Sequence, residues 1–269
     1  MNKKFAIVVL SCSLPEYHKF KLAQKRSWII DAESCGIKTY FIEGNGNYFD
    51  PNIFIKNVQS LATYDQNTIK FNCDDSLKGS FLKTLLGLNE IFSKTDVDFI
   101  FRTNLSSYLD IEMMEKYIKI HQIGSSVYSG VCGSTKIIKE RAYINGFLKT
   151  NIILSKTDFI SKRIHFASGA GYFIGREQFN SLCKTSRFIN LVDDVGIGYY
   201  LTKNDINPIT NLPRFWVPER SEKKMTKEYL QFIQDGGFHY RFKSNSRDND
   251  ANMLQSFSDH NFRKNWCVE

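Results

Sequence analysis

The order of apolar runs at the start of the chain places the strongest constraint on its fold. Residues 5–10 (Phe-Ala-Ile-Val-Val-Leu) are uniformly apolar and predict a buried strand. A helical stretch from Glu16 to Cys35 follows, and Gly36 supplies a common stop signal. Residues 37–42 form a second run that predicts another strand. Because a strand–helix–strand order joins parallel neighbours, we expect an α/β fold with a mixed, mostly parallel central sheet.

The rest of the chain continues this alternation. Apolar runs predict further strands at 98–102, 127–132 and 169–174 and helices at 111–120 and 194–203. A helix capped by Asp75 and Ser76 is predicted to face the core with Leu77, Phe81, Leu85, Leu88 and Phe92. No linker composition interrupts the chain. We therefore predict a single domain over residues 1–213, with the basic segment 214–269 as an extension packed on it.

Composition limits the classes of partner. The 269 residues are 42% hydrophobic, which is enough for a sizeable core, and the net charge of +8 favours anionic partners. The six cysteines form no Cys-x-x-Cys pair, which indicates free thiols in a reducing compartment. The apolar run at the N-terminus is too short for a signal peptide, and no stretch has the length of a membrane span. We expect a cytoplasmic protein, and we leave peripheral membrane contact through basic residues open.

Two short segments about twenty residues apart carry the clearest functional signal. Residues 167–175 (Ala-Ser-Gly-Ala-Gly-Tyr-Phe-Ile-Gly) form an apolar run whose glycines let another molecule approach the backbone. Asp193 and Asp194 stand at a predicted helix start, where the helix dipole favours negative charge. A backbone platform followed by a positioned carboxylate would suit a base-assisted transfer reaction. On local evidence alone, two helix-capping aspartates remain the alternative.

Several other site classes lack their motifs. The glycine spacing is one residue too long for a dinucleotide fingerprint, and no P-loop or Gly-x-Ser-x-Gly elbow occurs. Nucleic-acid binding is not expected, because the basic tail mixes its cations with acids and lacks a recognition motif. His239 follows a Gly-Gly pair and could hold a metal, contact a phosphate or be an ordinary buried imidazole.

The quoted segments resemble the fringe and β1,3-galactosyltransferase group of GT-A glycosyltransferases. Residues 25–28 (Lys-Arg-Ser-Trp) resemble the family's Arg-x-Thr-Trp, and residues 98–103 resemble its Phe-Val-x-Lys-Thr strand. Asp75-Ser76 with residues 82–88 (Leu-Lys-Thr-Leu-Leu-Gly-Leu) resembles its Asp-Ser-Tyr-x-Asn-Leu-Thr-Leu-Lys-Thr-Leu-x-Gly. Residues 167–172 are similar to its Ser-Gly-Ala-Gly-Tyr, and residues 193–198 to its Glu-Asp-Val-x-Val-Gly. These pieces occur in the family's order, so the resemblance implies a GT-A-like domain that binds a nucleotide sugar.

The resemblance also implies roles for individual residues. Asp194 is expected to be the general base of an inverting transfer, with Asp193 as the second choice. The floor under the donor or acceptor sugar is expected to be Ser168, Gly169, Ala170 and Gly171. The donor, a UDP-sugar, is expected at the carboxyl ends of the first strands, beside Ser11, Ser13, Lys25, Lys83, Arg102, Thr103, Asn104 and Ser106. The acceptor is expected to be a glycan or another hydroxyl compound, so the reaction would belong to glycan biosynthesis.

One departure concerns the metal. The family carries Asp-Asp-Asp after its Lys-Thr, and the outer carboxylates bridge a manganese ion to the diphosphate. This chain has Asn104-Leu105-Ser106 there, and amide or hydroxyl oxygens supply no negative charge to a hard cation. The resemblance leaves His239 and Ser106 as ligands for Mn²⁺ or Mg²⁺. The alternative is a metal-independent enzyme whose diphosphate is neutralised by Arg241, Lys243 and Arg247.

The sequence thus predicts a glycosyltransferase that uses a nucleotide sugar. A catalytically degenerate module that only binds a sugar nucleotide or a glycan is the alternative, and the missing Asp-x-Asp favours it. The aspartate pair opposes that alternative, because a binding module has no need of a base.

Overall fold

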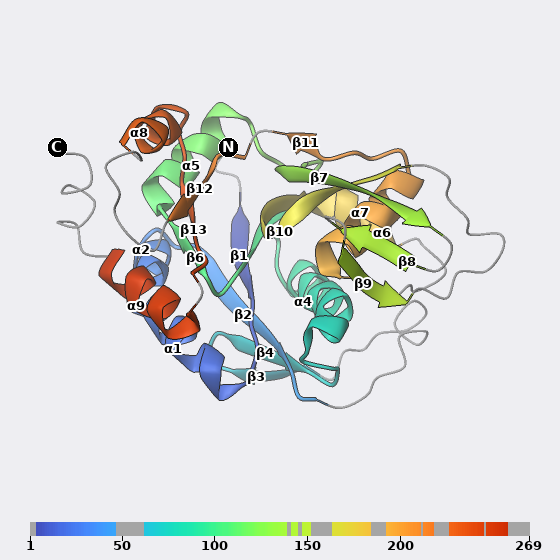
Figure 1. Cartoon of the computed structure of the whole chain (residues 1–269), viewed down its shortest axis with the longest axis horizontal. Helices are drawn as coiled ribbons and strands as arrows, with labels where there is room; N and C mark the ends of the chain where they lie inside the picture. Colours follow the sequence, from blue (N-terminus) through green and yellow to red (C-terminus); the bar gives the residue numbers. More distant parts are fainter. Residues whose placement is uncertain are drawn as a thin grey trace.

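The fold is described here from a computed structural model of the chain. The described residues are 4–46, 62–138, 141–144, 147–151, 163–183, 192–210, 212–217, 226–244 and 246–257. They form an α/β structure in which a twisted sheet runs through the middle of the molecule with helices on both sides (Figure 1). The predicted fold class is confirmed.

The main sheet is built around a block of parallel strands. β1 (Phe5–Leu10) lies between β2 (Lys38–Gly44) and β5 (Phe99–Asn104), and β4 (Thr68–Phe71) lies parallel to β2. The order across the sheet is β3-β4-β2-β1-β5-β10-β7-β8-β9, with β11 beside β7. The remaining strands are β3 (Thr63–Asp65), β7 (Tyr128–Ile138), β8 (Arg141–Ile144), β9 (Phe147–Asn151), β10 (Arg163–Gly175) and β11 (Ile209–Thr210). Because β10 runs antiparallel to β5, it brings the glycine segment back to the carboxyl ends of the parallel strands.

Strand alternation distributes the apolar side chains between two cores. Ala6 and Val8 face a core formed with α4 (Ser80–Lys94), α6 (Arg176–Cys183) and α7 (Asp193–Lys203). Ile7 and Val9 face the other core. Its helices are α1 (Pro15–Lys25), α2 (Trp28–Ser34), α5 (Ile111–Ile120), α8 (Thr226–Gln234) and α9 (Arg247–Phe257). Both faces of the parallel strands are therefore covered, as a parallel sheet requires.

A second, small sheet stands beside the main one. It contains β12 (Arg214–Val217), β13 (His239–Phe242) and β6 (Ser107–Leu109), in that order. Alternate side chains of the first two strands enter the second core, namely Phe215, Val217, Tyr240 and Phe242. The alternating positions between them, Arg214, Trp216, His239 and Arg241, therefore lie on the opposite face. The segment after residue 213 thus shares a sheet and a core with the rest of the chain.

Three local expectations were wrong. The segment predicted as one helix from Glu16 to Cys35 forms two helices, α1 and α2. They are separated at Ser27, because its backbone leaves the helical region. The hydroxyl of Ser27 donates to Ala23 O at 2.7 Å. Leu77 does not face the core, because a short 3₁₀ turn, η1 (Leu77–Gly79), precedes α4 and leaves this side chain 67% exposed. The cap of that turn is Ser76 alone, which accepts from Lys78 N, while Asp75 makes other contacts.

Two further sequence features can be located. Cys12, Cys35, Cys73, Cys132 and Cys183 are free thiols, and Cys267 lies outside the described residues. In the part of the chain that the structure describes, every helix is too short or too polar to cross a bilayer.

Candidate active site

A cavity of about 570 Å³ lies at the carboxyl ends of β1 and β5. It is bounded by the loop after β1, the turn before α4, the glycine segment of β10, the start of α7 and the segment from β13 to α9. Of the predicted site residues, it is lined by Ser11, Lys83, Arg102, Asn104, Ser106, Ser168, Gly169, Ala170, Asp193 and Asp194. Residues from distant parts of the sequence therefore meet where an open α/β sheet usually binds its ligand.

The other predicted site residues do not line this cavity. Lys25 lies over the ring of Phe41, with its Nζ 5.8 Å from the ring centroid. Thr103 is fully buried and donates to Ala170 O at 2.9 Å, so it supports the floor from below. The remaining three, Ser13, Gly171 and His239, also serve internal contacts, which are described below.

Asp194 is the carboxylate that faces the cavity. It is half-buried at the start of α7, where the helix dipole stabilises its negative charge. Its Oδ2 accepts from Gly169 N at 2.8 Å, and its Oδ1 accepts from Val195 N at 2.9 Å. The glycine floor thus fixes the orientation of this carboxylate.

Asp193 also borders the cavity, but its carboxylate is held in a buried ion pair. It pairs with Arg102, whose other guanidinium nitrogen donates to Gly169 O. Burial raises the pKa of Asp193 to about 6, although the attraction of Arg102 opposes this shift. The two neighbouring aspartates therefore differ, because Asp193 is buried and paired with Arg102, whereas Asp194 is half-buried and accepts from backbone N–H groups. Both guanidinium ends of Arg102 are engaged, so Arg102 braces the floor although it was predicted to bind the donor.

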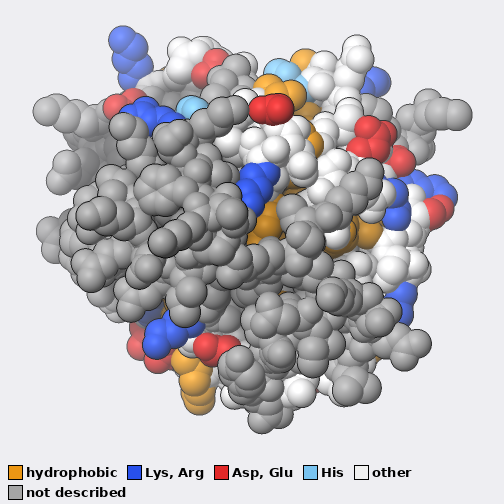
Figure 2. Space-filling model, turned by 90° about the vertical axis from the view of Figure 1, so that its right-hand side faces the viewer, with side chains coloured by type: hydrophobic (Ala, Val, Ile, Leu, Met, Phe, Trp, Pro, Cys, Tyr) orange, Lys and Arg blue, Asp and Glu red, His pale blue; other side chains and the backbone are white. Residues whose placement is uncertain are grey.

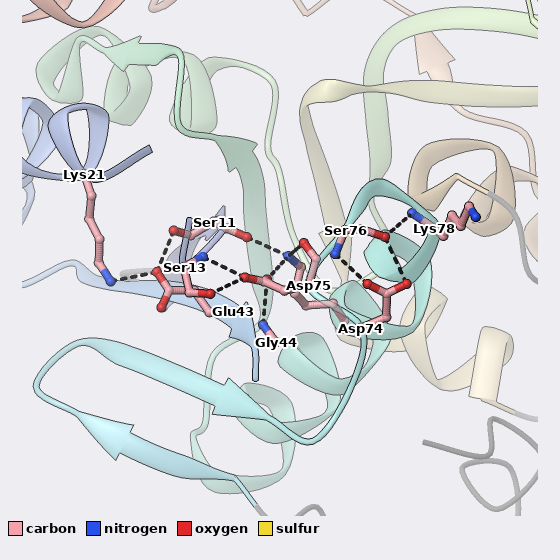
Figure 3. Close-up of polar contacts among 10 residues, drawn as sticks. Ser11, Ser13, Lys21, Glu43, Gly44, Asp74, Asp75, Ser76 and Lys78 are labelled. Carbon is pink, nitrogen blue, oxygen red and sulfur yellow. Dashed lines mark hydrogen bonds and ion pairs between the residues drawn. The ribbon is translucent and has the colours of Figure 1, made fainter. Parts of the chain in front are cut away.

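Asp75 joins three elements at the end of the cavity near Ser11 (Figure 3). Its Oδ2 accepts from Ser13 N and Ser13 Oγ at 2.6 and 2.8 Å, which occupies the hydroxyl predicted to contact the donor. Its Oδ1 accepts from Gly44 N at 2.8 Å and from Lys83 Nζ at 2.6 Å. Lys83 also donates to Ser11 O at 2.6 Å and is buried. Lys83 and Ser13 therefore hold the loop around the cavity in place.

Glu43 extends this network behind Ser11. Its Oε1 accepts from Ser11 Oγ at 2.8 Å and pairs with Lys21 Nζ at 2.8 Å (Figure 3). Glu43 is buried, so this charge needs the lysine as its partner. The side-chain hydroxyl of Ser11 is consequently fixed at the edge of the cavity.

Cationic side chains from β13 and the segment after it form one wall of the cavity. Arg241, Lys243 and Arg247, the three cations predicted from the basic tail, all line the cavity. Arg241 Nη1 donates to Asn104 Oδ1. Burial, with the nearby Arg214 and Arg247, lowers the pKa of Arg241 to about 9. The wall is therefore a concentration of positive charge in a partly desolvated place.

These residues do not fit a divalent metal ion. Asn104 Oδ1 accepts from Arg241, from Ser107 Oγ at 3.2 Å and from Ser106 Oγ at 3.4 Å, so its oxygen is already satisfied. His239 is fully buried, and its Nε2 lies 3.0 Å from Ser107 Oγ. Burial and the charges of Arg214 and Arg241 lower the pKa of His239 well below its usual value. Among the described residues, no three His, Cys, Asp or Glu side chains gather in a metal-binding group.

Sequence reasoning missed two residues beside the cationic wall. Arg214 Nη1 donates to Ser168 Oγ at 3.0 Å, and its guanidinium lies over the ring of Trp216, 5.0 Å from the ring centroid. Trp216 lines the cavity and is 47% exposed. The alternation in Arg-Phe-Trp-Val (residues 214–217) was the available signal, because the apolar Phe215 and Val217 direct the residues between them to the other face.

A family model described as Galactosyltransferase matches residues 22–212, which is more than half of the chain. The chain belongs to the galactosyltransferase family. This confirms the resemblance drawn from the sequence motifs, and the protein is a glycosyltransferase with a sugar donor and an acceptor as its partners. The matched segment of this galactosyltransferase-family member contains Asn104, the glycine floor and both aspartates, whereas Arg214 and Arg241 lie beyond it.

Two solved structures resemble this family member at low sequence identity. A glycosyltransferase involved in the glycosylation of the major capsid of PBCV-1 is 10% identical over 93% of this chain and 99% of that chain, with a TM-score of 0.47. The 2-C-methyl-D-erythritol 4-phosphate cytidylyltransferase of Francisella tularensis is 11% identical over 78% of this chain and 89% of that chain, with a TM-score of 0.36. No curated protein matches the sequence. These two likenesses are too weak to bear on the mechanism.

Proposed function

We propose that this glycosyltransferase transfers a sugar from a UDP-sugar to a hydroxyl group of a glycan or similar acceptor, with inversion at the anomeric carbon. The observation that carries the proposal is the arrangement of one cavity. A half-buried carboxylate, Asp194, lies on a backbone floor, and a wall of cations lies in the same cavity. A base and a site for an anionic leaving group are the two parts that such a reaction needs.

The reaction would proceed in one displacement. Asp194 takes the proton of the acceptor hydroxyl as the hydroxyl oxygen attacks the anomeric carbon. The bond from that carbon to the diphosphate oxygen breaks, and its electron pair leaves with the nucleoside diphosphate. The cations of the wall stabilise the charge that develops on this leaving group. The attack and departure occur on opposite sides of the anomeric carbon, so its configuration inverts.

The remaining predicted residues fall into two groups. Ser11, Asn104 and Ser106 line the end of the cavity where the nucleoside and diphosphate would bind. Residues 168–170 form the floor beside the base, where the transferred sugar or the acceptor would bind.

The test is Asp194→Asn in a transfer assay. A thermal-shift screen of UDP-, GDP-, CMP- and dTDP-sugars first identifies a donor, because a ligand that binds the folded state raises the Tm. With that donor and a panel of saccharide acceptors, we expect kcat to fall about 10²–10⁴-fold while donor binding stays unchanged. The anomeric configuration of the product, read by NMR, tests inversion.

Asp205→Asn serves as the control, because Asp205 is exposed beyond the other end of the same helix. Near-normal turnover by Asp194→Asn, with the fold intact, would rule out this base. Donor binding without release of UDP in the presence of any acceptor would favour the degenerate binding module.

A further inference from the structure

We propose that Arg241, held on Asn104, binds the donor diphosphate at the position where the family motif places its metal-binding carboxylates. The inference rests on the function proposed above, and it makes nucleoside diphosphate binding independent of a divalent metal. The metal's charge would then be supplied by a side chain from β13, a strand that lies beyond the matched family segment.

The first step concerns Asn104. It ends β5 and follows Thr103, so it occupies the first position of the family's Asp-Asp-Asp. Its side-chain oxygen accepts from the Arg241 guanidinium and faces two serine hydroxyls. An oxygen engaged by three donors has no lone pair free for a cation, and a guanidinium already stands beside it. This position is therefore occupied by positive charge from the protein itself.

The second step concerns how firmly Arg241 is placed. β13 lies between β12 and β6, and Arg241 is in register with Trp216 on one side and Ser107 on the other. The neighbours of Arg241 along the strand, Tyr240 and Phe242, are buried in the second core. The backbone of Arg241 is thus fixed by two ladders and by packing, and the guanidinium needs little reorganisation to bind an anion.

The third step is the charge balance of the wall. In the described part of the chain, no carboxylate forms an ion pair with Arg214, Arg241 or Lys243. Arg247 is the partial exception, because Asp250 Oδ2 lies 3.8 Å from its Nη1. The Nε atoms of Arg214 and Arg241 are buried without a hydrogen-bond partner. Burying an unpaired positive charge costs free energy. The wall is therefore suited to a ligand that carries more than one negative charge.

A diphosphate matches this wall in charge and in geometry. The guanidinium group presents parallel N–H donors that suit two phosphate oxygens, and such charge-assisted bonds are strong. Asp194 and the floor line the same cavity, so the base and the bound anion would share one site. A nucleoside without phosphates would meet only the end of the cavity near Ser11.

The experiment is a calorimetric titration of the full chain with UDP, UMP and uridine. Each titration is run with EDTA and again with Mn²⁺. We expect UDP to bind in EDTA with an affinity within about threefold of that in Mn²⁺. We expect Arg241→Gln to lower the affinity for UDP by about ten- to a hundredfold, because a charge-assisted contact is lost. The affinity for uridine should stay nearly unchanged.

Arg163→Gln is the matched control, because Arg163 is exposed at the start of β10 and does not line the cavity. UDP binding that disappears in EDTA and returns with Mn²⁺ would overturn the inference, and this comparison needs no variant. An equal loss of UDP affinity in Arg163→Gln and Arg241→Gln would overturn it as well, because the net charge of the protein would then explain the binding. Metal-free UDP binding together with normal transfer by Asp194→Asn would instead contradict only the proposed function.

Discussion

At the scale of single residues, Asn104 places a neutral amide against the guanidinium of Arg241 at the end of β5. Asn104→Asp would place a carboxylate against Arg241 and neutralise the cation assigned to the diphosphate. We predict that UDP affinity in EDTA falls about tenfold, as measured by calorimetry. Asn204→Asp is the control, since Asn204 is exposed just after α7. Unchanged UDP affinity in Asn104→Asp would argue against a role for Arg241.

Two glycines of the floor are constrained in different ways. A Cβ at Gly171 would lie 2.5 Å from His239 Cε1, a buried ring that has no room to move. A Cβ at Gly169 would lie 3.2 Å from Asp193 Oδ1 and 3.3 Å from Asp194 Oδ2, so those carboxylates would have to shift slightly. The absence of a side chain at Gly171 therefore allows the two sheets to pack closely. At Gly169 it leaves room for Asp194, the proposed base.

We predict that Gly171→Ala lowers the free energy of unfolding by about 1–3 kcal/mol through overpacking. Gly169→Ala should leave the Tm nearly unchanged and lower kcat, because a misplaced base loses efficiency. Urea denaturation and the transfer assay separate the two effects. The opposite pattern, with Gly169→Ala unstable and Gly171→Ala inactive but stable, would contradict this division.

At the scale of elements, β13 belongs to the small sheet and packs against the glycine floor, because its His239 lies next to Gly171. His239 on this strand is fully buried and neutral, since burial and two arginines lower its pKa. In the unfolded chain its pKa returns to about 6.5, so the unfolded state binds the extra proton below that pH. His239 therefore favours folding above about pH 6.5, and this contribution is lost as the pH falls.

We predict that the Tm falls between pH 7.5 and pH 5.5, and that His239→Gln reduces this fall. Differential scanning calorimetry at the two pH values checks the difference. His18→Gln is the control, because His18 is exposed on α1. An equal pH dependence in the wild type and in His239→Gln would assign the effect to other groups.

At the scale of the whole molecule, the segment after residue 213 completes the core. It contributes to the second core Phe215, Val217, Phe238, Tyr240, Phe242, Leu254 and Phe257. It also supplies Arg241, Lys243 and Arg247 to the cavity, so the cationic wall and the second core are built from the same segment. On the face shown in Figure 2, by contrast, basic and acidic side chains of the described residues lie next to one another.

We predict that the full chain unfolds in one cooperative transition and that residues 1–213 alone do not fold. Removal of β12, α8, β13 and α9 would expose the apolar face beneath them, which a marginally stable protein cannot tolerate. Calorimetry and circular dichroism of the two proteins provide the measurement. A truncated protein with its own sharp melting transition would show that the C-terminal segment is a separable extension.

Local sequence patterns predicted the elements whose bounds depend on interactions between residues close in the sequence. The helix over Ile111–Ile120 has its predicted bounds, because its apolar period and its Asp110 cap lie within one short segment. The strand predicted at 169–174 begins earlier, at Arg163, since β10 also pairs with β7 over residues that carry no clear strand pattern. The start of β10 is thus set by its pairing with β7, a strand more than twenty residues away in the sequence.

The sequence by itself determined the α/β class, the family and the presence of an aspartate pair beside a glycine floor. Only the tertiary structure decided which aspartate faces the cavity, because the choice depends on Arg102 reaching Asp193 across the floor. Only the tertiary structure brought Arg241 onto Asn104, 137 positions away in the chain. Periodicity and motifs report short-range preferences, whereas these contacts follow from strand register and packing, which involve the whole chain at once.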